Sequence, residues 1–244
     1  MPKFAVIIPA AGRSTRFGDK NYKKPFINLD NKAVWLHAAE RFMDRRDVCQ
    51  TLVVIAEEDR EFFEMKFGAN ITILGIDLVV GGAERSDSVS NALAKLSDDA
   101  EYVAVHDAAR PCIADAWINN VFSEAEKTAA AILATPVVGT LKRSESGKTI
   151  DETVSRSGLW EAQTPQVFRR DLLEKAYAER GDFRATDDAQ LVERIGHPVS
   201  IVEGSALNLK ITRRQDLKVA SAALRALPKA RKTGGGNPLD DMLR

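Results

Sequence analysis

The stretch FAVIIP at residues 4–9, which leads into AAG at residues 10–12, decides the fold class of this chain. It is an almost continuous apolar run that ends in proline and glycine. Such a run is typical of a parallel strand that is buried on both faces and feeds a loop. Further apolar runs of this kind recur along the chain, at residues 51–56, 71–80, 102–106 and 130–136.

Segments with helical periodicity alternate with these apolar runs. The alternation predicts an α/β fold, a three-layer, Rossmann-like and mainly parallel sheet. In such sheets ligands bind beyond the carboxyl ends of the strands, so we expect the functional residues in the loops that follow the strands. The expected helices lie at residues 33–43, 88–96 and 115–128. The loops of interest are PAAGRSTR at residues 9–16, GGAERSDS at residues 81–88 and HDAARP at residues 106–111.

Residues 136–157 break this α/β pattern. VVGTLKR and KTIDETVSR are extended and polar at alternate positions, and the turn-forming SESG joins them, which predicts a projecting β-hairpin arm with two long polar strands. Two such strands without a helix beside them have little core of their own, so we expect a homodimer that forms through the arm. We therefore expect one domain at residues 1–227 that includes the arm, and a flexible C-terminal tail at residues 228–244.

The composition excludes several classes of protein. The 244 residues are 44% hydrophobic and 29% charged, as in an ordinary globular domain, which argues against a collagen, a coiled coil or a disordered chain. The 35 basic residues balance 35 acidic ones, so we expect no nucleic-acid partner. The apolar run near the N-terminus is too short for a membrane span, and we expect no membrane partner. Cys49 and Cys112 form no metal or disulfide pattern, which favours a reduced, cytoplasmic setting.

The first loop combines small residues with two arginines. Ala10, Ala11 and Gly12 let backbone amides approach an anion, and Arg13 and Arg16 could neutralise that anion, as expected of a loop that binds a nucleoside triphosphate. Neither G-x-G-x-x-G nor G-x-x-x-x-G-K-[ST] occurs in the chain, so the dinucleotide fingerprint and the phosphate loop of common ATPases are absent as literal matches. By itself the loop is equally compatible with an ordinary strand-to-helix connection whose arginines are solvated.

The loops that follow the later strands offer glycines and a carboxylate. The glycine pair at 81–82 permits close approach of a ligand, while Ser86 or Ser88 can cap the helix that follows. Asp107, at the end of a strand, can hold a magnesium ion that bridges phosphate oxygens, or it can cap a helix. His106 beside it is expected to pack in the core. The basic flap at residues 20–25 closes over phosphates or is a solvated charge run.

Nine segments, in order and with compatible spacing, resemble the 2-C-methyl-D-erythritol 4-phosphate cytidylyltransferase family. The resemblance extends over roughly residues 4–220 and leaves the tail outside. Single elements such as the TPQ tripeptide are unspecific, but nine ordered matches are not expected by chance. The segments are PAAGRSTR, the basic flap that ends at Lys24, GGAERSDSV, VHDAARP, TLKR, TVSRSGLW, QTPQVF, ATDDA and NLKIT.

The resemblance implies a nucleotidyltransferase that joins CTP and methylerythritol phosphate, with Mg²⁺, and releases pyrophosphate in nonmevalonate isoprenoid biosynthesis. The acceptor phosphate attacks the α-phosphorus directly, so cations that reduce the repulsion between two anions are the central catalysts. In this family the arm crosses to the other subunit and completes its site. By motif position the resemblance implies four catalytic cations (Arg16, Lys24, Arg156 and Lys210), a nucleotide site (Ala10, Ala11, Gly12, Gly82, Ser88 and Asp107), an acceptor site (Arg110, Thr140, Thr164 and Thr186) and Asp107 as the magnesium ligand.

The chain departs from the family pattern at three places. The sequence KKP at residues 23–25 stands where Pro-Lys-Gln is usual, so Lys23 could share the role of the catalytic lysine. Ala83 replaces an acidic residue near the cytosine, which leaves the selection of the base to other groups. Leu207 replaces an acidic residue that assists the metal in some members, so Asp107 is expected to hold magnesium with more water and phosphate ligands.

Three other functions remain open. Ribitol-5-phosphate cytidylyltransferases share the nucleotide half and differ mainly in the acceptor, although the PAAG opening and HDAARP favour methylerythritol phosphate. Sugar-nucleotide pyrophosphorylases resemble this chain chiefly in the first loop. A catalytically silent nucleotide-binding dimer would lack the phosphate-directed charges, whereas this chain retains Arg16, Lys24, Asp107, Arg156 and Lys210.

Overall fold

The structure, a computed structural model, describes residues 2–12 and 24–228, with only the backbone of Lys24. Within these residues the central sheet has seven strands, β1 (Phe4–Pro9), β4 (Val48–Ile55), β5 (Asp77–Val80), β6 (Tyr102–Val105), β7 (Ala130–Pro136), β10 (Trp160–Arg169) and β11 (Ser200–Glu203). Their order across the sheet is β11-β7-β10-β6-β1-β4-β5. All neighbours pair parallel except β10, which runs antiparallel to β6 and to β7. The predicted mainly parallel α/β sheet is confirmed.

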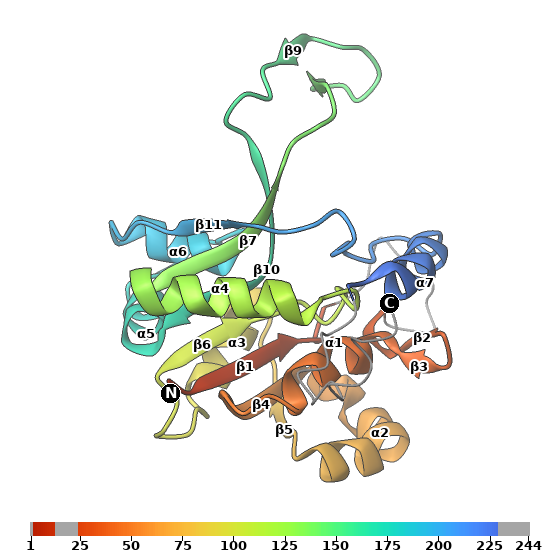
Figure 1. Ribbon diagram of the computed structural model, residues 1–244, viewed down its shortest axis with the longest axis vertical. Helices are drawn as coiled ribbons and strands as arrows, with labels where there is room; N and C mark the ends of the chain where they lie inside the picture. The colour runs from red at the N-terminus through yellow and green to blue at the C-terminus, as the bar shows by residue number, and fades with distance from the viewer. Residues whose placement is uncertain (1, 13–23, 229–244) are drawn as a thin grey trace, which may run out of the picture.

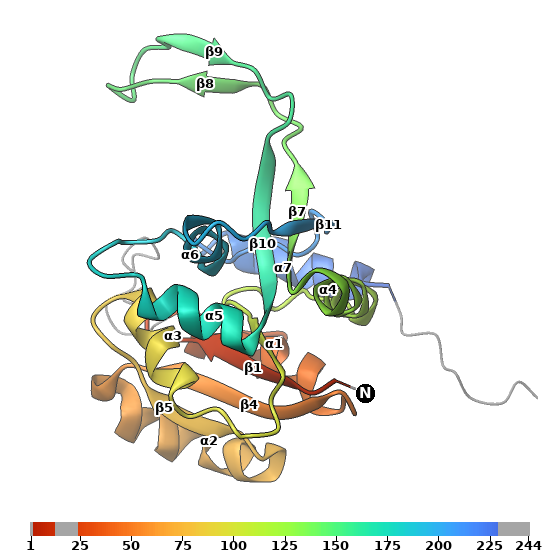
Figure 2. The same cartoon turned by 90° about the vertical axis from the view of Figure 1, so that its left-hand side faces the viewer.

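Helices cover both faces of this sheet (Figures 1 and 2). They are α1 (Val34–Met43), α2 (Arg60–Leu74), α3 (Arg85–Leu93), α4 (Asp115–Thr128), α5 (Arg170–Ala178), α6 (Asp188–Arg194) and α7 (Asp216–Ala226). Helices α1, α2 and α4 bury their apolar sides in one core cluster, and α3, α5 and α6 bury theirs in a second cluster on the other face. The three predicted layers are therefore present. No helix in the described part of the chain is long and apolar enough to cross a bilayer.

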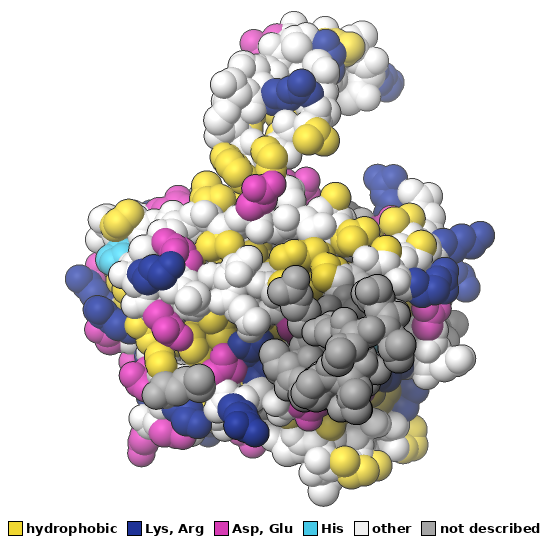
Figure 3. Space-filling view, viewed as in Figure 1, with side chains coloured by type: hydrophobic (Ala, Val, Ile, Leu, Met, Phe, Trp, Pro, Cys, Tyr) yellow, Lys and Arg dark blue, Asp and Glu magenta, His cyan; other side chains and the backbone are white. Residues whose placement is uncertain are grey.

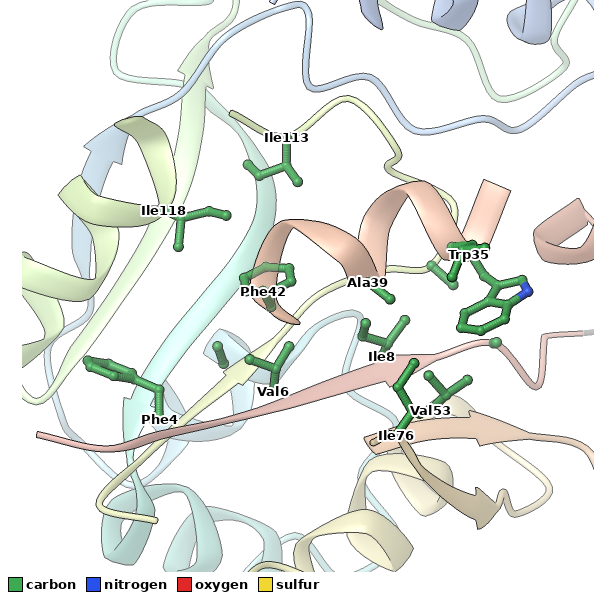
Figure 4. Packing of buried hydrophobic residues seen from close by; sticks show 14 of the residues in the cluster. Phe4, Val6, Ile8, Trp35, Ala39, Phe42, Val53, Ile76, Ile113 and Ile118 are labelled. Carbon is green, nitrogen blue, oxygen red and sulfur yellow. The ribbon is translucent and has the colours of Figure 1, made fainter. Parts of the chain in front are cut away.

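Strand β1 shows why its apolar run lies inside the sheet. Phe4, Val6 and Ile8 belong to the cluster under α1, α2 and α4, whereas Ala5 and Ile7 belong to the cluster on the opposite face. All five side chains are fully buried, and each large one contributes about 1.5–3 kcal/mol through the hydrophobic effect. Figure 4 shows the first of these two clusters. Burial on both faces fixes β1 in the sheet and places the loop after it at the carboxyl edge.

The strand predicted at residues 71–80 is wrong in its first half. Helix α2 continues through Leu74, and its Ile71 and Leu74 pack against the core cluster. Gly75 then ends the helix in a left-handed conformation with a φ of 61°. The apolar run therefore contains the end of helix α2 and the short strand β5 (Asp77–Val80). The apolar pattern of the sequence did not show the boundary between them.

The predicted hairpin arm is present and projects from the ends of β7 and β10 (Figures 1 and 2). Its strands β8 (Leu141–Arg143) and β9 (Glu152–Val154) pair antiparallel in a separate sheet. Each strand has three residues, so the two long strands expected from the sequence are shorter than predicted. Within the described residues, no third strand pairs with β8 or β9. A further small ladder joins β2 (Asn28–Leu29) to β3 (Lys32–Ala33).

Candidate active site

A cavity of about 730 Å³ lies at the carboxyl edge of the central sheet. Pro9 and the loop after β1, Ala56 after β4, the glycine pair after β5 and Asp107 after β6 all contribute to its wall. This is the edge at which parallel sheets bind ligands. Seven of the residues predicted for the site line this cavity: the six of the nucleotide site, Ala10, Ala11, Gly12, Gly82, Ser88 and Asp107, and the catalytic Lys210.

The loop after β5 is held close against the start of α3. The Gly82 amide donates a hydrogen bond of 3.1 Å to the Ser88 hydroxyl, which in turn donates to the Glu84 carbonyl at 3.1 Å. A Cβ atom on Gly82 would lie 2.4 Å from the Cβ of Asp87, so only glycine fits there without rearrangement. Glu84 and Asp87 form a capping box at the start of α3, which begins at Arg85, three residues earlier than expected. Ser88 therefore orders the cavity loop and does not cap the helix.

Asp107 is the centre of a charged cluster at the cavity wall. Its carboxylate lies 2.7 Å from Lys210 Nζ, 3.6 Å from Arg85 Nε and 3.8 Å from Arg110 Nε. Burial alone would raise the pKa of Asp107, but the three cations outweigh burial and hold its pKa below the ordinary range. The carboxylate is thus ionised at neutral pH. Helix α4 begins only at Asp115, so Asp107 does not cap it.

Behind Asp107, a chain of hydrogen bonds fixes its backbone. Burial lowers the pKa of His106 to about 4, so its imidazole is neutral at pH 7. His106 Nε2 lies 3.0 Å from the Arg110 carbonyl, which can only accept, and this assigns the ring proton to Nε2. Nδ1 then accepts from the Thr164 hydroxyl at 3.1 Å, and that hydroxyl oxygen accepts from the Asp107 amide at 3.0 Å. The prediction that His106 packs in the core is confirmed.

Arg110 and Thr164 support the cavity from beneath its wall. Arg110 donates to the Asn208 carbonyl at 2.7 Å and to the Ala162 carbonyl at 3.3 Å, and only 6% of Arg110 is exposed. Burial lowers the pKa of Arg110, with Asp107 acting in the opposite direction. Asn208 also donates to the Thr164 carbonyl at 2.9 Å. These contacts bring the two predicted acceptor residues to Asp107, with the Arg110 guanidinium anchored to backbone oxygens.

The remaining predicted residues lie elsewhere or outside the description. Thr140 and Arg156 are exposed on the arm, away from the cavity wall, and Arg156 donates to the Val138 carbonyl. Thr186 is exposed before α6, and its amide donates to the Gln190 side chain at 2.8 Å. Arg16, the flap around Lys23 and the tail beyond residue 228 lie outside the described residues, as does the side chain of Lys24, whose backbone begins the 3-10 helix η2 (Lys24–Phe26).

Sequence reasoning missed four charged residues of the cavity wall, among them Glu84, which directly precedes Arg85. Arg85 stands inside the quoted loop GGAERSDS, and its spacing from the glycines places it at the start of α3. Glu57 and Glu58 follow β4 directly, in the 3-10 helix η3 (Glu57–Asp59), so the rule about strand ends applies to them as well. Of the departures from the family pattern, Ala83 lines the cavity, whereas Leu207 packs against an apolar cluster beside α7.

The chemistry of the donors restricts the kind of metal that this cavity accommodates. No group of three or more His, Cys, Asp and Glu side chains within residues 2–12 and 24–228 is arranged to hold a metal. Mg²⁺ is commonly bound by one or two carboxylates together with substrate phosphates and water. Asp107 fits that mode, because its carboxylate faces the cavity and its nearest cation, Lys210, has a side chain that is 41% exposed and free to shift.

The chain is similar in sequence to one family over almost its whole length. Residues 4–226 match the model of the 2-C-methyl-D-erythritol 4-phosphate cytidylyltransferase family. A protein of that name from Rhodopirellula baltica is 46% identical over 231 residues, which cover 90% of this chain and 94% of the relative. One from Bacillus velezensis is 43% identical over 228 residues, which cover 92% of this chain and 97% of the relative.

Solved structures agree with the sequence comparison. The 2-C-methyl-D-erythritol 4-phosphate cytidylyltransferase of Francisella tularensis superimposes with a TM-score of 0.77 at 31% identity, covering 91% of this chain and all of the other. The enzyme of that name from Thermus thermophilus superimposes with a TM-score of 0.73 at 34% identity, covering 90% and 98% of the two chains.

Proposed function

Because this chain belongs to the 2-C-methyl-D-erythritol 4-phosphate cytidylyltransferase family, we propose that it transfers the cytidylyl group of CTP to 2-C-methyl-D-erythritol 4-phosphate. An oxygen of the acceptor phosphate forms a bond to the α-phosphorus of CTP. The bond from that phosphorus to the oxygen that bridges to the β-phosphate breaks, and pyrophosphate leaves. The other product is 4-diphosphocytidyl-2-C-methyl-D-erythritol, a precursor in nonmevalonate isoprenoid biosynthesis.

The observation that carries this proposal is the charged cluster around Asp107. It lies in the same cavity as the loop after β1, whose residues Ala10, Ala11 and Gly12 have small side chains. Two anions must meet in this reaction, and Arg85 and Lys210 supply positive charge on the cavity wall. Fixed charges stabilise the α-phosphate and the departing pyrophosphate without reorganisation at the moment of reaction. Ala10, Ala11 and Gly82 let the nucleotide approach the backbone closely. The geometry therefore favours a nucleotidyltransferase over a silent binding protein.

Magnesium is part of the proposal. Asp107 would hold the ion, with substrate phosphate oxygens and water as the other ligands. The bound ion would neutralise phosphate charge. Asp107 is suited to this role because the surrounding cations keep its carboxylate ionised. Lys210 contacts the same carboxylate and remains available to a phosphate when the metal takes its place.

We also propose that the active protein is a homodimer joined through the arm. Hydrophobic side chains gather where the arm leaves the sheet (Figure 3). Val138 is 80% exposed, Trp160 42% and Leu159 40%, and a second copy of the chain would cover them. The arm carries Thr140 and Arg156 outside the cavity of its own chain, so these two residues reach a site only if the partner provides it. The free cysteines Cys49 and Cys112 support a cytoplasmic location.

The test is release of pyrophosphate from CTP and Mg²⁺ with each of two acceptors. We expect turnover with methylerythritol phosphate and very little with ribitol 5-phosphate or without an acceptor. A preference for ribitol 5-phosphate would replace the proposed acceptor while keeping the reaction. No release with either acceptor, from protein that binds CTP in a calorimetric titration, would favour the silent binding protein instead.

A further inference from the structure

Arg85 occupies an unusual position between the cavity and the core. It is the first residue of α3, it lines the cavity, and its side chain is 32% exposed. Its Nε atom lies 3.6 Å from Asp107, and its Nη2 atom donates a hydrogen bond of 2.7 Å to Asp188. The third nitrogen, Nη1, has no acceptor among the described residues. One edge of the guanidinium is thus anchored, while the group as a whole remains on the cavity wall.

Asp188 is the anchor and is itself fully buried. Its exposed fraction is 0%, although it is a carboxylate at the start of α6. One carboxylate oxygen accepts from Arg85, and the other accepts from the Tyr177 hydroxyl at 2.5 Å. Burial and the nearby Asp188 raise the pKa of Tyr177 above its ordinary value, so the phenol keeps the proton that it donates. Each oxygen of the buried carboxylate therefore has a partner.

The backbone of Asp188 is fixed as firmly as its side chain. Its amide and that of Ala189 both donate to the side-chain oxygen of Gln166 at 3.0 Å. Gln166 lies in β10, and its amide nitrogen donates to Asp187, the capping residue of α6, at 2.8 Å. The carboxylate is therefore held by the sheet and by α5, and it has little freedom to follow Arg85 if that side chain moves.

A buried carboxylate is costly unless a cation compensates it, so retention of Asp188 in the core calls for a reason. Within the described residues, Arg85, Arg110 and Lys210 supply three positive charges against the two negative charges of Asp107 and Asp188. These five side chains together carry one positive charge, and Glu57, Glu58 and Glu84 also line the cavity. Without Asp188 the Arg85 guanidinium would be free to pair more closely with Asp107 or to turn toward solvent.

We propose that Asp188 is a positioning residue of the transfer reaction and that it holds the Arg85 guanidinium on the cavity wall, facing the phosphates of the substrates. Tyr177 completes this device by fixing the second oxygen of Asp188. Arg85 is then a phosphate-directed cation in addition to those expected from the sequence. The inference rests on the proposed function, because it assigns these residues a part in that reaction.

The test compares Arg85→Gln, Asp188→Asn and the double variant with the wild type, using pyrophosphate release to obtain kcat and KM. We expect Asp188→Asn to lower kcat by about 10–100-fold, the range found when groups that orient a ligand are removed. Because Asp188 acts through Arg85, the double variant should lose no more activity than Arg85→Gln alone. Losses that multiply, or an unchanged kcat in folded Asp188→Asn, would overturn the proposal.

The matched control is Asp47→Asn, which breaks the Arg45–Asp47 ion pair before β4, at the opposite edge of the sheet. That pair is also largely buried, with hydrogen bonds of 2.9 and 2.6 Å, so its loss lowers the melting temperature without reaching the cavity. If Asp188→Asn does not fold, Tyr177→Phe tests the same device: it should lower kcat several-fold, and an unchanged kcat contradicts the inference. A wild type that releases no pyrophosphate would refute the proposed function itself.

Discussion

The cavity and the arm differ in how their functional side chains are held in place. At the cavity, side chains from several strands and helices converge on Asp107, and each charged group has partners within the same chain. On the arm, the paired strands are three residues long. Thr140 and Arg156 are exposed there and do not line the cavity of their own chain. The cations at Asp107 are therefore set by folding, whereas in the proposed dimer the arm contributes to the site of the second copy of the chain.

This difference indicates which charged groups are already in place before substrate binds. A cation that is tied to buried carboxylates and carbonyls loses little freedom when substrate binds, so its interaction energy is available for the transition state. In the proposed dimer, a cation on the exposed arm becomes ordered only when it contacts the second subunit. Changes at the cavity should thus act in every subunit by itself, while changes on the arm should act across subunits.

The largest expected effect is from Lys210→Ala at the cavity. This variant removes the cation nearest to Asp107, and kcat should fall by about 10³-fold, the upper end of what one positioned charge contributes. Lys218→Ala, on the exposed side of α7, is the matched control and should keep wild-type kcat. A loss in kcat of less than about tenfold for Lys210→Ala, in protein with the melting temperature of the wild type, would contradict the assignment of this cavity as the active site.

Next in size is the pH dependence of stability set by buried His106. The pKa of His106 is lowered to about 4 from an ordinary 6.5. Between pH 6.5 and pH 4 this histidine is therefore protonated in the unfolded chain and neutral in the folded protein. The free energy of unfolding should therefore decrease as pH falls from 6.5 to 4, by about 3 kcal/mol in total. Urea titrations at several pH values measure this slope.

His106→Asn should flatten that pH dependence, at the cost of a lower stability at pH 7. His197→Gln is the control, and it should keep the wild-type slope because the buried imidazole remains. An equally steep slope in His106→Asn would show that other groups set it.

The arm is tested by Arg156→Ala, for which we expect a loss of about 10²-fold in kcat with CTP binding retained. The informative experiment forms mixed dimers from Arg156→Ala and Lys210→Ala chains. Half of the dimers are then hybrids, and each hybrid has one site with both residues intact, so about a quarter of wild-type activity should return. If the arm serves its own chain, mixing restores nothing.

The smallest effect contrasts two glycines. In Gly82→Ala the new methyl group would meet Asp87 at 2.4 Å, so the variant should lose about 1–3 kcal/mol of stability. Gly139→Ala, on the arm, meets nothing within 4 Å and should change stability by less than about 0.5 kcal/mol. Equal destabilisation by the two changes would contradict the difference in packing between the two regions.

The elements that a local pattern determines were predicted well. The strands at residues 4–9 and 130–136 and the helix at 115–128 have the bounds expected from their apolar patterns. The run at 71–80 was misassigned because the last turn of a helix, with Ile71 and Leu74 packed against the core, is as apolar as a buried strand. Strand β10 was not assigned at all, since Glu161, Gln163 and Gln166 interrupt its apolar pattern and its first three residues are exposed.

The candidate site divides in the same way. The loops after the strands were identified from their position, and the cavity joins three of them at one edge. Arg85 lies inside the loop GGAERSDS but was not predicted as a site residue. Its position on the cavity wall depends on its hydrogen bond to Asp188, which is 103 positions later in the chain. Likewise, nothing local distinguishes Thr164 from any buried threonine until His106 and Asp107 are placed beside it.

By itself, the sequence determined the alternation of strands and helices, the loops rich in glycine and charge, and the family, because periodicity and ordered motifs are local properties of the chain. Only the tertiary structure decided which charges meet. Asp107, Arg85, Asp188 and Lys210 come from four separate segments, and their attraction acts over a few ångströms that exist only after the sheet has brought those segments together.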